Sequence, residues 1–151
     1  RASDAVTGAH GHEILLETGA CHPDAHAVYA QAPPADLLVL AGSARADIDA
    51  RLARGLPDGI DAPITGCQAQ TGLLGGAPCL ANLVFAADAL RHRLAPPMTG
   101  LLRPVAGRDF VTGAARPLRG NRAAVLSRDG NGVGAAYRLH LPSHPFAGPL
   151  Q

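Results

Sequence analysis

The sequence contains very few aromatic residues. It has no tryptophan, three phenylalanines and two tyrosines among 151 residues, although hydrophobic residues make up 47% of the chain. Large rings therefore cannot fill the interior, and any core must be built from alanine, leucine and valine packed closely around small residues. The length and hydrophobic content are sufficient for one compact domain.

Long runs of charged or apolar residues are also absent. The 13 basic residues, all arginine, and the 12 acidic residues are dispersed and give a net charge of +1. Binding of nucleic acid needs a clustered basic face, so the sequence predicts no nucleic-acid partner. No window approaches 18 consecutive apolar residues and no signal-peptide pattern is present, so the sequence predicts neither a membrane span nor secretion.

Cysteine is scarce and shows no recognisable pattern. Cys21, Cys67 and Cys79 cannot all pair, and none belongs to a Cys-x-x-Cys motif. We therefore expect a reducing, cytoplasmic location. Cys67 and Cys79 stand in apolar surroundings and are interpreted as small core residues.

The first half of the chain contains weak signals followed by a strong one. A short strand near residues 13–17 and a short helix near 24–31 are expected within an irregular stretch. The continuous apolar run at 37–41 is typical of a strand that is buried on both faces. A helix capped by Ser43 and a short strand at 62–67 should follow, and the apolar stripe of this helix comprises Ile48, Leu52 and Leu56.

The second half is dominated by one apolar segment. Small residues at 71–77 precede a helix that has Pro78 in its first turn and ends at Arg91 and His92. This helix is apolar almost all round, which predicts burial inside the fold. Residues 122–127 and 133–141 indicate two strands joined by a turn containing Asn-Gly. The order of elements predicts an α/β layered fold.

Several segments together resemble the ketosynthase family. Residues 65–97, TGCQAQTGLLGGAPCLANLVFAADALRHRLAPP, are similar to the family's Lys-Ser-x-Thr-Gly-His sequence, which is followed by a small-residue loop, a buried helix ending in Ala-Leu-Arg, and Pro-Pro. Residues 2–5 resemble the family's Ser-Ser-Asp-Ala. Residues 37–43 resemble the strand that leads into its Ala-His-Gly-Thr loop. Residues 109–117 resemble the segment after Pro-Pro, and residues 130–134 resemble its Gly-Phe-Gly-Gly turn.

This resemblance implies the C-terminal half of a thiolase-like fold, an α/β layered sheet with a buried central helix. Residues 1–151 would then form one ketosynthase-like C-terminal domain that is incomplete without an N-terminal half or a partner. Such a half-fold would leave the apolar helix at 80–90 exposed, which predicts an obligate partner or aggregation.

The resemblance also implies that this chain has lost the catalytic residues. A working ketosynthase uses a cysteine nucleophile and two histidines that stabilise developing charge, supported by a lysine. Ala41 matches the first histidine, Leu73 matches the second, and Gln68 stands at the lysine. Alanine and leucine side chains cannot donate hydrogen bonds, so we predict no catalytic residue in this chain.

Chain-length factors of type II polyketide synthases retain the ketosynthase fold but lack the catalytic residues. The resemblance therefore implies a non-catalytic subunit that pairs with a catalytic β-ketoacyl synthase, works with an acyl carrier protein and shapes the cavity for the growing acyl chain. Leu73, Leu74 and Val133 are the candidates for lining that cavity. In the alternative hypothesis, the assembled complex transfers or decarboxylates acyl groups with a cysteine and histidines from the missing half or partner.

Three further patterns have both a functional and a structural explanation: the histidines and cysteine near the N-terminus, the glycines at 72–76 and four arginines. Imidazole and thiolate are good metal ligands, so a small metal-binding domain is a third hypothesis, but the spacing matches no strong motif and we predict no metal site. No Gly-Lys-Ser/Thr follows the glycines at 72–76, so we expect close packing there and no cofactor. Four arginines are candidates for contact with an acidic carrier protein, with a solvated surface as the alternative. The possible metal ligands are His10, His12, Cys21, His22 and His26, and the arginines are Arg91, Arg93, Arg103 and Arg108.

Overall fold

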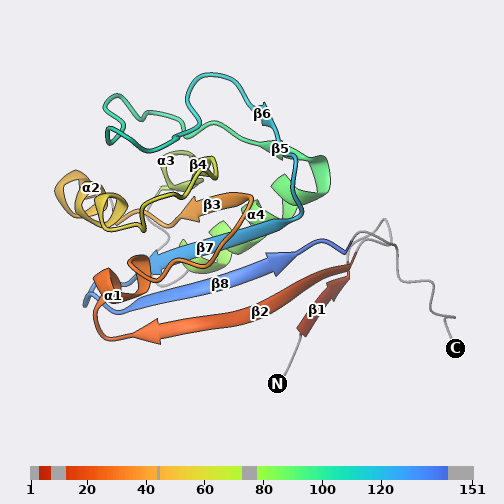
Figure 1. Ribbon diagram of the computed structural model, residues 1–151, viewed down its shortest axis with the longest axis horizontal. Helices are drawn as coiled ribbons and strands as arrows, with labels where there is room; N and C mark the ends of the chain where they lie inside the picture. Colours follow the sequence, from red (N-terminus) through yellow and green to blue (C-terminus); the bar gives the residue numbers. More distant parts are fainter. Residues whose placement is uncertain (1–3, 8–12, 44, 73–77, 143–151) are drawn as a thin grey trace, which may run out of the picture.

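The computed structural model describes residues 4–7, 13–43, 45–72 and 78–142. Within these ranges a mixed six-stranded sheet lies at the centre, in the order β1-β2-β8-β7-β3-β4 (Figure 1). The strands span Asp4–Thr7 (β1), Glu13–His22 (β2), Leu37–Leu40 (β3), Ile64–Thr65 (β4), Arg122–Arg128 (β7) and Gly134–His140 (β8). β3 runs parallel to β7 and β4, and the other neighbours are antiparallel.

The alternation of side chains along β3 creates two apolar layers. Leu37 and Val39 face one core and Leu38 and Leu40 face the other, and all four are buried. The first core is covered by α4 (Pro78–His92), and the second by α1 (Ala25–Tyr29) and α2 (Ala46–Arg54). The predicted strand buried on both faces and the α/β layering are therefore confirmed.

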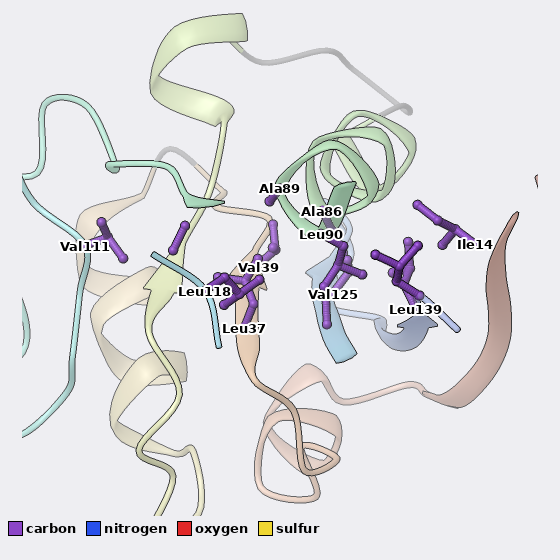
Figure 2. Packing of buried hydrophobic residues seen from close by; sticks show 13 residues of the cluster. Ile14, Leu37, Val39, Ala86, Ala89, Leu90, Val111, Leu118, Val125 and Leu139 are labelled. Atoms are coloured by element: carbon purple, nitrogen blue, oxygen red, sulfur yellow. The ribbon is translucent and has the colours of Figure 1, made fainter. Parts of the chain in front are cut away.

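Helix α4 is buried on the side that faces the sheet. Ala86, Ala89 and Leu90 are at most 2% exposed and lie against Val125 and its neighbours (Figure 2). On the same helix, Leu80 is 66% exposed and Val84 is 71% exposed. Among the residues that the structure describes, α4 is therefore covered on one face only, and the predicted burial all round is not seen there.

The start of α2 differs from the prediction. Arg45 occupies the N-cap position without a side-chain hydrogen bond that caps the helix, and Ser43 lies before the helix. The backbone N–H and hydroxyl of Ser43 instead donate to Asp49 Oδ1, each over 2.8 Å. Leu52 is buried within α2, and Leu56 is buried just beyond its end. The apolar stripe is correct, but the serine binds the side chain of Asp49 in the first turn instead of capping the helix.

The hairpin of β7 and β8 confirms the predicted pair of strands. Asp129 organises the turn, because its Oδ1 accepts the backbone N–H groups of Asn131 at 2.9 Å and Val133 at 2.8 Å. Gly132 has a φ of +96°, a conformation that favours glycine. A short helix α3 (Gln68–Thr71) and a small pair of strands, β5 (Leu94–Ala95) and β6 (Arg116–Pro117), were not predicted.

No helix in the described ranges is both long enough and apolar enough to cross a lipid bilayer.

Candidate functional site

A pocket of about 380 Å³ opens at the carboxyl ends of β3 and β4. In α/β sheets this is the end where ligands commonly bind. The walls come from α2, from the segment that follows β4, and from the long connection after Pro97. They consist of Leu40, Gly42, Ala46, Asp49, Ala50, Ala53, Gly66, Gln68, Ala69, Met98, Thr99, Gly100, Leu101, Arg103, Val105 and Phe110. Most of these side chains are apolar, so the pocket suits an aliphatic group.

Close backbone contacts shape this pocket. A Cβ atom at Gly66 would lie 2.5 Å from the Leu40 carbonyl oxygen and 3.2 Å from Met98 Cε, so only glycine fits where β4 ends against β3. The Thr65 hydroxyl donates to the Pro96 carbonyl over 2.6 Å, and the Met98 N–H donates to the Val111 carbonyl over 2.8 Å. These bonds hold the long connection against the end of the sheet.

Two of the three positions that the resemblance matches to catalytic residues lie at this end of the fold. Ala41 directly follows β3, is 1% exposed, and donates its N–H to the Leu126 carbonyl over 2.8 Å. Gln68 begins α3 and lines the pocket. Leu73 and the cavity candidate Leu74 lie outside the described residues. The described part of the site thus contains a methyl group and a neutral amide at positions that the resemblance assigns to histidine and lysine.

The amide of Gln68 has an unusual environment. Its Oε1 and Nε2 atoms are both buried, and neither has a hydrogen-bond partner among the residues that the structure describes. A Cβ added to Gly42 would lie 3.3 Å from Gln68 Oε1 and 3.2 Å from Asp49 Oδ2, so the amide and the carboxylate flank the same glycine. Sequence reasoning treated Gln68 only as a replaced lysine. No pattern in the sequence indicates this environment, because it is formed by three separate segments: the residues after β3, helix α2 and helix α3.

Val133, the third cavity candidate, lies elsewhere. It is 37% exposed beside the β7–β8 turn and is not among the residues that line the pocket. Its role in an acyl cavity stays a prediction.

Cys67 and Cys79 are not set up as nucleophiles. Cys67 is 4% exposed and contacts the buried Asn82 side chain, which confirms its assignment to the core. Cys79 is only half-buried, at the start of α4. Burial raises the pKa of its thiol, and hydrogen bonds with Ser127 and Tyr137 offset part of the rise. The Cys79 thiol is therefore held in its less reactive, protonated form.

The possible metal ligands do not converge in the described part of the chain, where no three His, Cys, Asp or Glu residues are grouped suitably for a metal ion. His22 Nδ1 accepts the Asp24 N–H over 3.0 Å, and Asp24 Oδ1 accepts the His26 N–H over 2.9 Å at the start of α1. Cys21 is exposed. His10 and His12 lie outside the described residues.

Two of the four candidate arginines stabilise the fold. Arg93 donates to the Gly120 carbonyl over 2.8 Å, and Arg108 donates to carbonyls at and beyond the end of α2. A cation at a helix C-terminus is favourable, because the last carbonyl groups there lack helical partners. Arg91 and Arg103 are exposed, and Arg103 also borders the pocket. Among the four arginines, Arg91 and Arg103 are therefore the two for which the described residues show no hydrogen bond to a carbonyl group.

The chain matches no protein-family model and no curated protein. It is similar in fold to ketosynthase twelve of the bacillaene polyketide synthase from Bacillus amyloliquefaciens, with a TM-score of 0.70, 16% identity, and coverage of 86% of this chain and 30% of that one. It is also similar to the ishigamide ketosynthase/chain length factor, with a TM-score of 0.66, 17% identity, and coverage of 88% and 38%.

A third similar structure is a type II polyketide synthase acyl-carrier protein in complex with its ketosynthase bound to the hexaketide. Its TM-score is 0.66 at 15% identity, with coverage of 88% of this chain and 39% of that one. The chain thus spans well under half the length of these three structures. At such identities the similarity establishes architecture, and the chain therefore has the fold of part of a ketosynthase.

Proposed function

We propose that this chain is part of a ketosynthase-like subunit that does not itself form the carbon–carbon bond, of the chain-length-factor kind found in type II polyketide or fatty-acyl assembly. The observation that carries the proposal is Ala41 at the carboxyl end of β3, where the resemblance expects a histidine. Its methyl group cannot donate a hydrogen bond to the negative charge that develops on a thioester oxygen. Gln68 likewise carries no positive charge where the resemblance expects a lysine.

The exposed face of α4 supports a subunit that is completed by further protein. Burying a leucine or valine side chain stabilises a protein by about 1.5 to 3 kcal/mol, so covering what remains exposed of Leu80 and Val84 is worth roughly 2 to 4 kcal/mol. We propose that the remaining half of the subunit covers this face, and that the completed subunit pairs with a catalytic ketosynthase in the cytoplasm and serves an acyl carrier protein.

Within that complex, Leu73, Leu74 and Val133 line the cavity that receives the growing acyl chain. Replacing Val133 with tryptophan should then shorten the product, because the larger side chain fills the cavity. Product length is measured by mass spectrometry of the released chains. Leu102→Trp is the matched control, since Leu102 is 91% exposed in the long connection. Unchanged product length with Val133→Trp would remove Val133 from the cavity.

The non-catalytic role is tested in the purified complex supplied with malonyl-loaded carrier protein. Replacing the nucleophilic cysteine of the catalytic ketosynthase with alanine should abolish condensation, because this chain offers no substitute. Condensation that persists would refute the role. It would favour the alternative that a cysteine and histidines in the rest of this subunit transfer or decarboxylate acyl groups. Intact-mass analysis of the co-purified chains identifies the partners in the same sample.

A further inference from the structure

The pocket at the carboxyl ends of β3 and β4 combines apolar walls with a buried amide that no residue within 4–7, 13–43, 45–72 and 78–142 satisfies. Ala50, Ala53, Leu101 and Phe110 are among the apolar residues that line it. Gln68 contributes this amide, and its donor and acceptor are both buried without a partner in the described part of the chain. Nearly all buried polar atoms in folded proteins are hydrogen-bonded, so an unsatisfied pair beside a cavity requires a specific explanation.

The surroundings of the amide restrict what it can bind. Gln68 Oε1 and Asp49 Oδ2 lie on the same side of Gly42, where an added Cβ would be 3.3 Å and 3.2 Å from them. Asp49 already accepts two hydrogen bonds from Ser43, so its carboxylate is held in place. An anionic group next to these two oxygens would be repelled, particularly where water is excluded. The group that complements Gln68 is neutral and carries both a donor and an acceptor.

We propose that this pocket binds a neutral carboxamide carried on an aliphatic chain. The carboxamide carbonyl accepts from Gln68 Nε2 and its N–H donates to Gln68 Oε1, while the aliphatic chain contacts the apolar walls. The volume of about 380 Å³ lies within the range of small-molecule sites, roughly 300 to 1,000 Å³. Val133 is not among the residues that line this pocket, and the proposal does not depend on the chain-length role.

The test compares three probes of equal chain length: hexanamide, 1-hexanol and hexanoate. Binding is followed on the purified 151-residue chain, in the form in which it is isolated, through NMR shifts of the pocket methyl groups of Ala50, Ala53 and Leu101. We expect hexanamide to bind about three- to tenfold more tightly than 1-hexanol, which corresponds to one or two net hydrogen bonds, and hexanoate to bind most weakly. Equal affinities, or no shifts with hexanamide, would overturn the proposal.

Two variants assign the preference to the amide. Gln68→Met keeps the length of the side chain and removes both polar atoms, so the preference for hexanamide over 1-hexanol should disappear while 1-hexanol still binds. Gln31→Met is the matched control, because Gln31 is an exposed glutamine just after α1. Gly42→Ala places a methyl group 3.3 Å from Gln68 Oε1 and should weaken hexanamide severalfold. A preference that survives both pocket variants would place the binding elsewhere and refute the assignment.

Discussion

Replacing Gln68 with methionine should stabilise the ligand-free chain. The two amide atoms are buried and find no partner in the ranges that the structure describes, and leaving a buried polar group unsatisfied costs about 1 to 3 kcal/mol. Methionine has a similar length, is flexible and has no strong hydrogen-bonding group, so it can fill the same space without that penalty. The free energy of unfolding should therefore rise by about 1 to 3 kcal/mol.

Calorimetry and urea denaturation measure this change. For a domain of this size each kcal/mol shifts Tm by about 2 to 4 °C, so the midpoint should rise by at least about 2 °C. The exposed control Gln31→Met should stay within about 0.5 kcal/mol of the original chain. An unchanged or lower Tm for Gln68→Met would refute the reasoning, because it would mean that the amide is satisfied in solution. A higher Tm together with lost hexanamide preference would show that the residue is kept for binding at the expense of stability.

Three further predictions concern other parts of the fold. The double variant Leu80→Arg, Val84→Arg should barely change the unfolding free energy of this chain but should weaken its co-purification with further subunits at least tenfold. The control Leu102→Arg should leave co-purification unchanged. Equal retention of the double variant and the control in pull-downs would contradict the role of the α4 face. Burial raises the pKa of Tyr29, whose hydroxyl donates to the Leu126 carbonyl, so the folded chain keeps this proton longer than the unfolded chain and stability falls as pH rises above about 10. In Tyr29→Phe, the unfolding free energy from urea denaturation should therefore fall less steeply between about pH 9.5 and 11 than in the original chain. Parallel pH profiles for the two chains would show that Tyr29 does not cause the fall. Asp36→Ala removes the acceptor of the backbone N–H groups of Asn121 and Arg122, each at 3.0 Å, and should lower the unfolding free energy by about 2 to 4 kcal/mol, as measured by urea denaturation. Asp58→Ala, on an exposed turn, is the control. An equally small loss of stability in both variants would contradict the prediction.

Local patterns in the sequence were sufficient where one segment determines its own structure. The apolar run at Leu37–Leu40 has no polar face and the short length of a strand, which predicted a strand covered on both sides. Pro78 and the basic pair at 91–92 mark the two ends of α4, and the Asn-Gly pair marks the β7–β8 turn. In each case a local physical constraint, such as a missing N–H or a positive φ, selects one conformation.

The remaining features depend on contacts between distant segments. β2 runs on to His22, beyond the predicted end, and a Cβ at Gly19 would lie 2.2 Å from the Ala136 carbonyl oxygen. Glycine there signals a close approach to β8 and not the break that its propensity suggests. Ser43 binds Asp49 because the chain folds back after β3. The resemblance identified Ala41 and Gln68 only as positions where catalytic residues are replaced. The pocket beside them depends on the long connection, whose position no local pattern indicates.

The position of β3 in the sheet has a consequence for how the chain folds. Its parallel neighbour β7 comes from the last quarter of the sequence, and the Arg122 N–H that binds Asp36 lies 86 positions later. During synthesis one edge of the apolar strand at Leu37–Leu40 therefore stays unpaired until residues 122–128 have left the ribosome. The local β7–β8 hairpin can form quickly, whereas its joining to β3 closes a long loop and should set the folding rate. A nascent chain stalled before residue 122 would expose the strand edge that most readily aggregates.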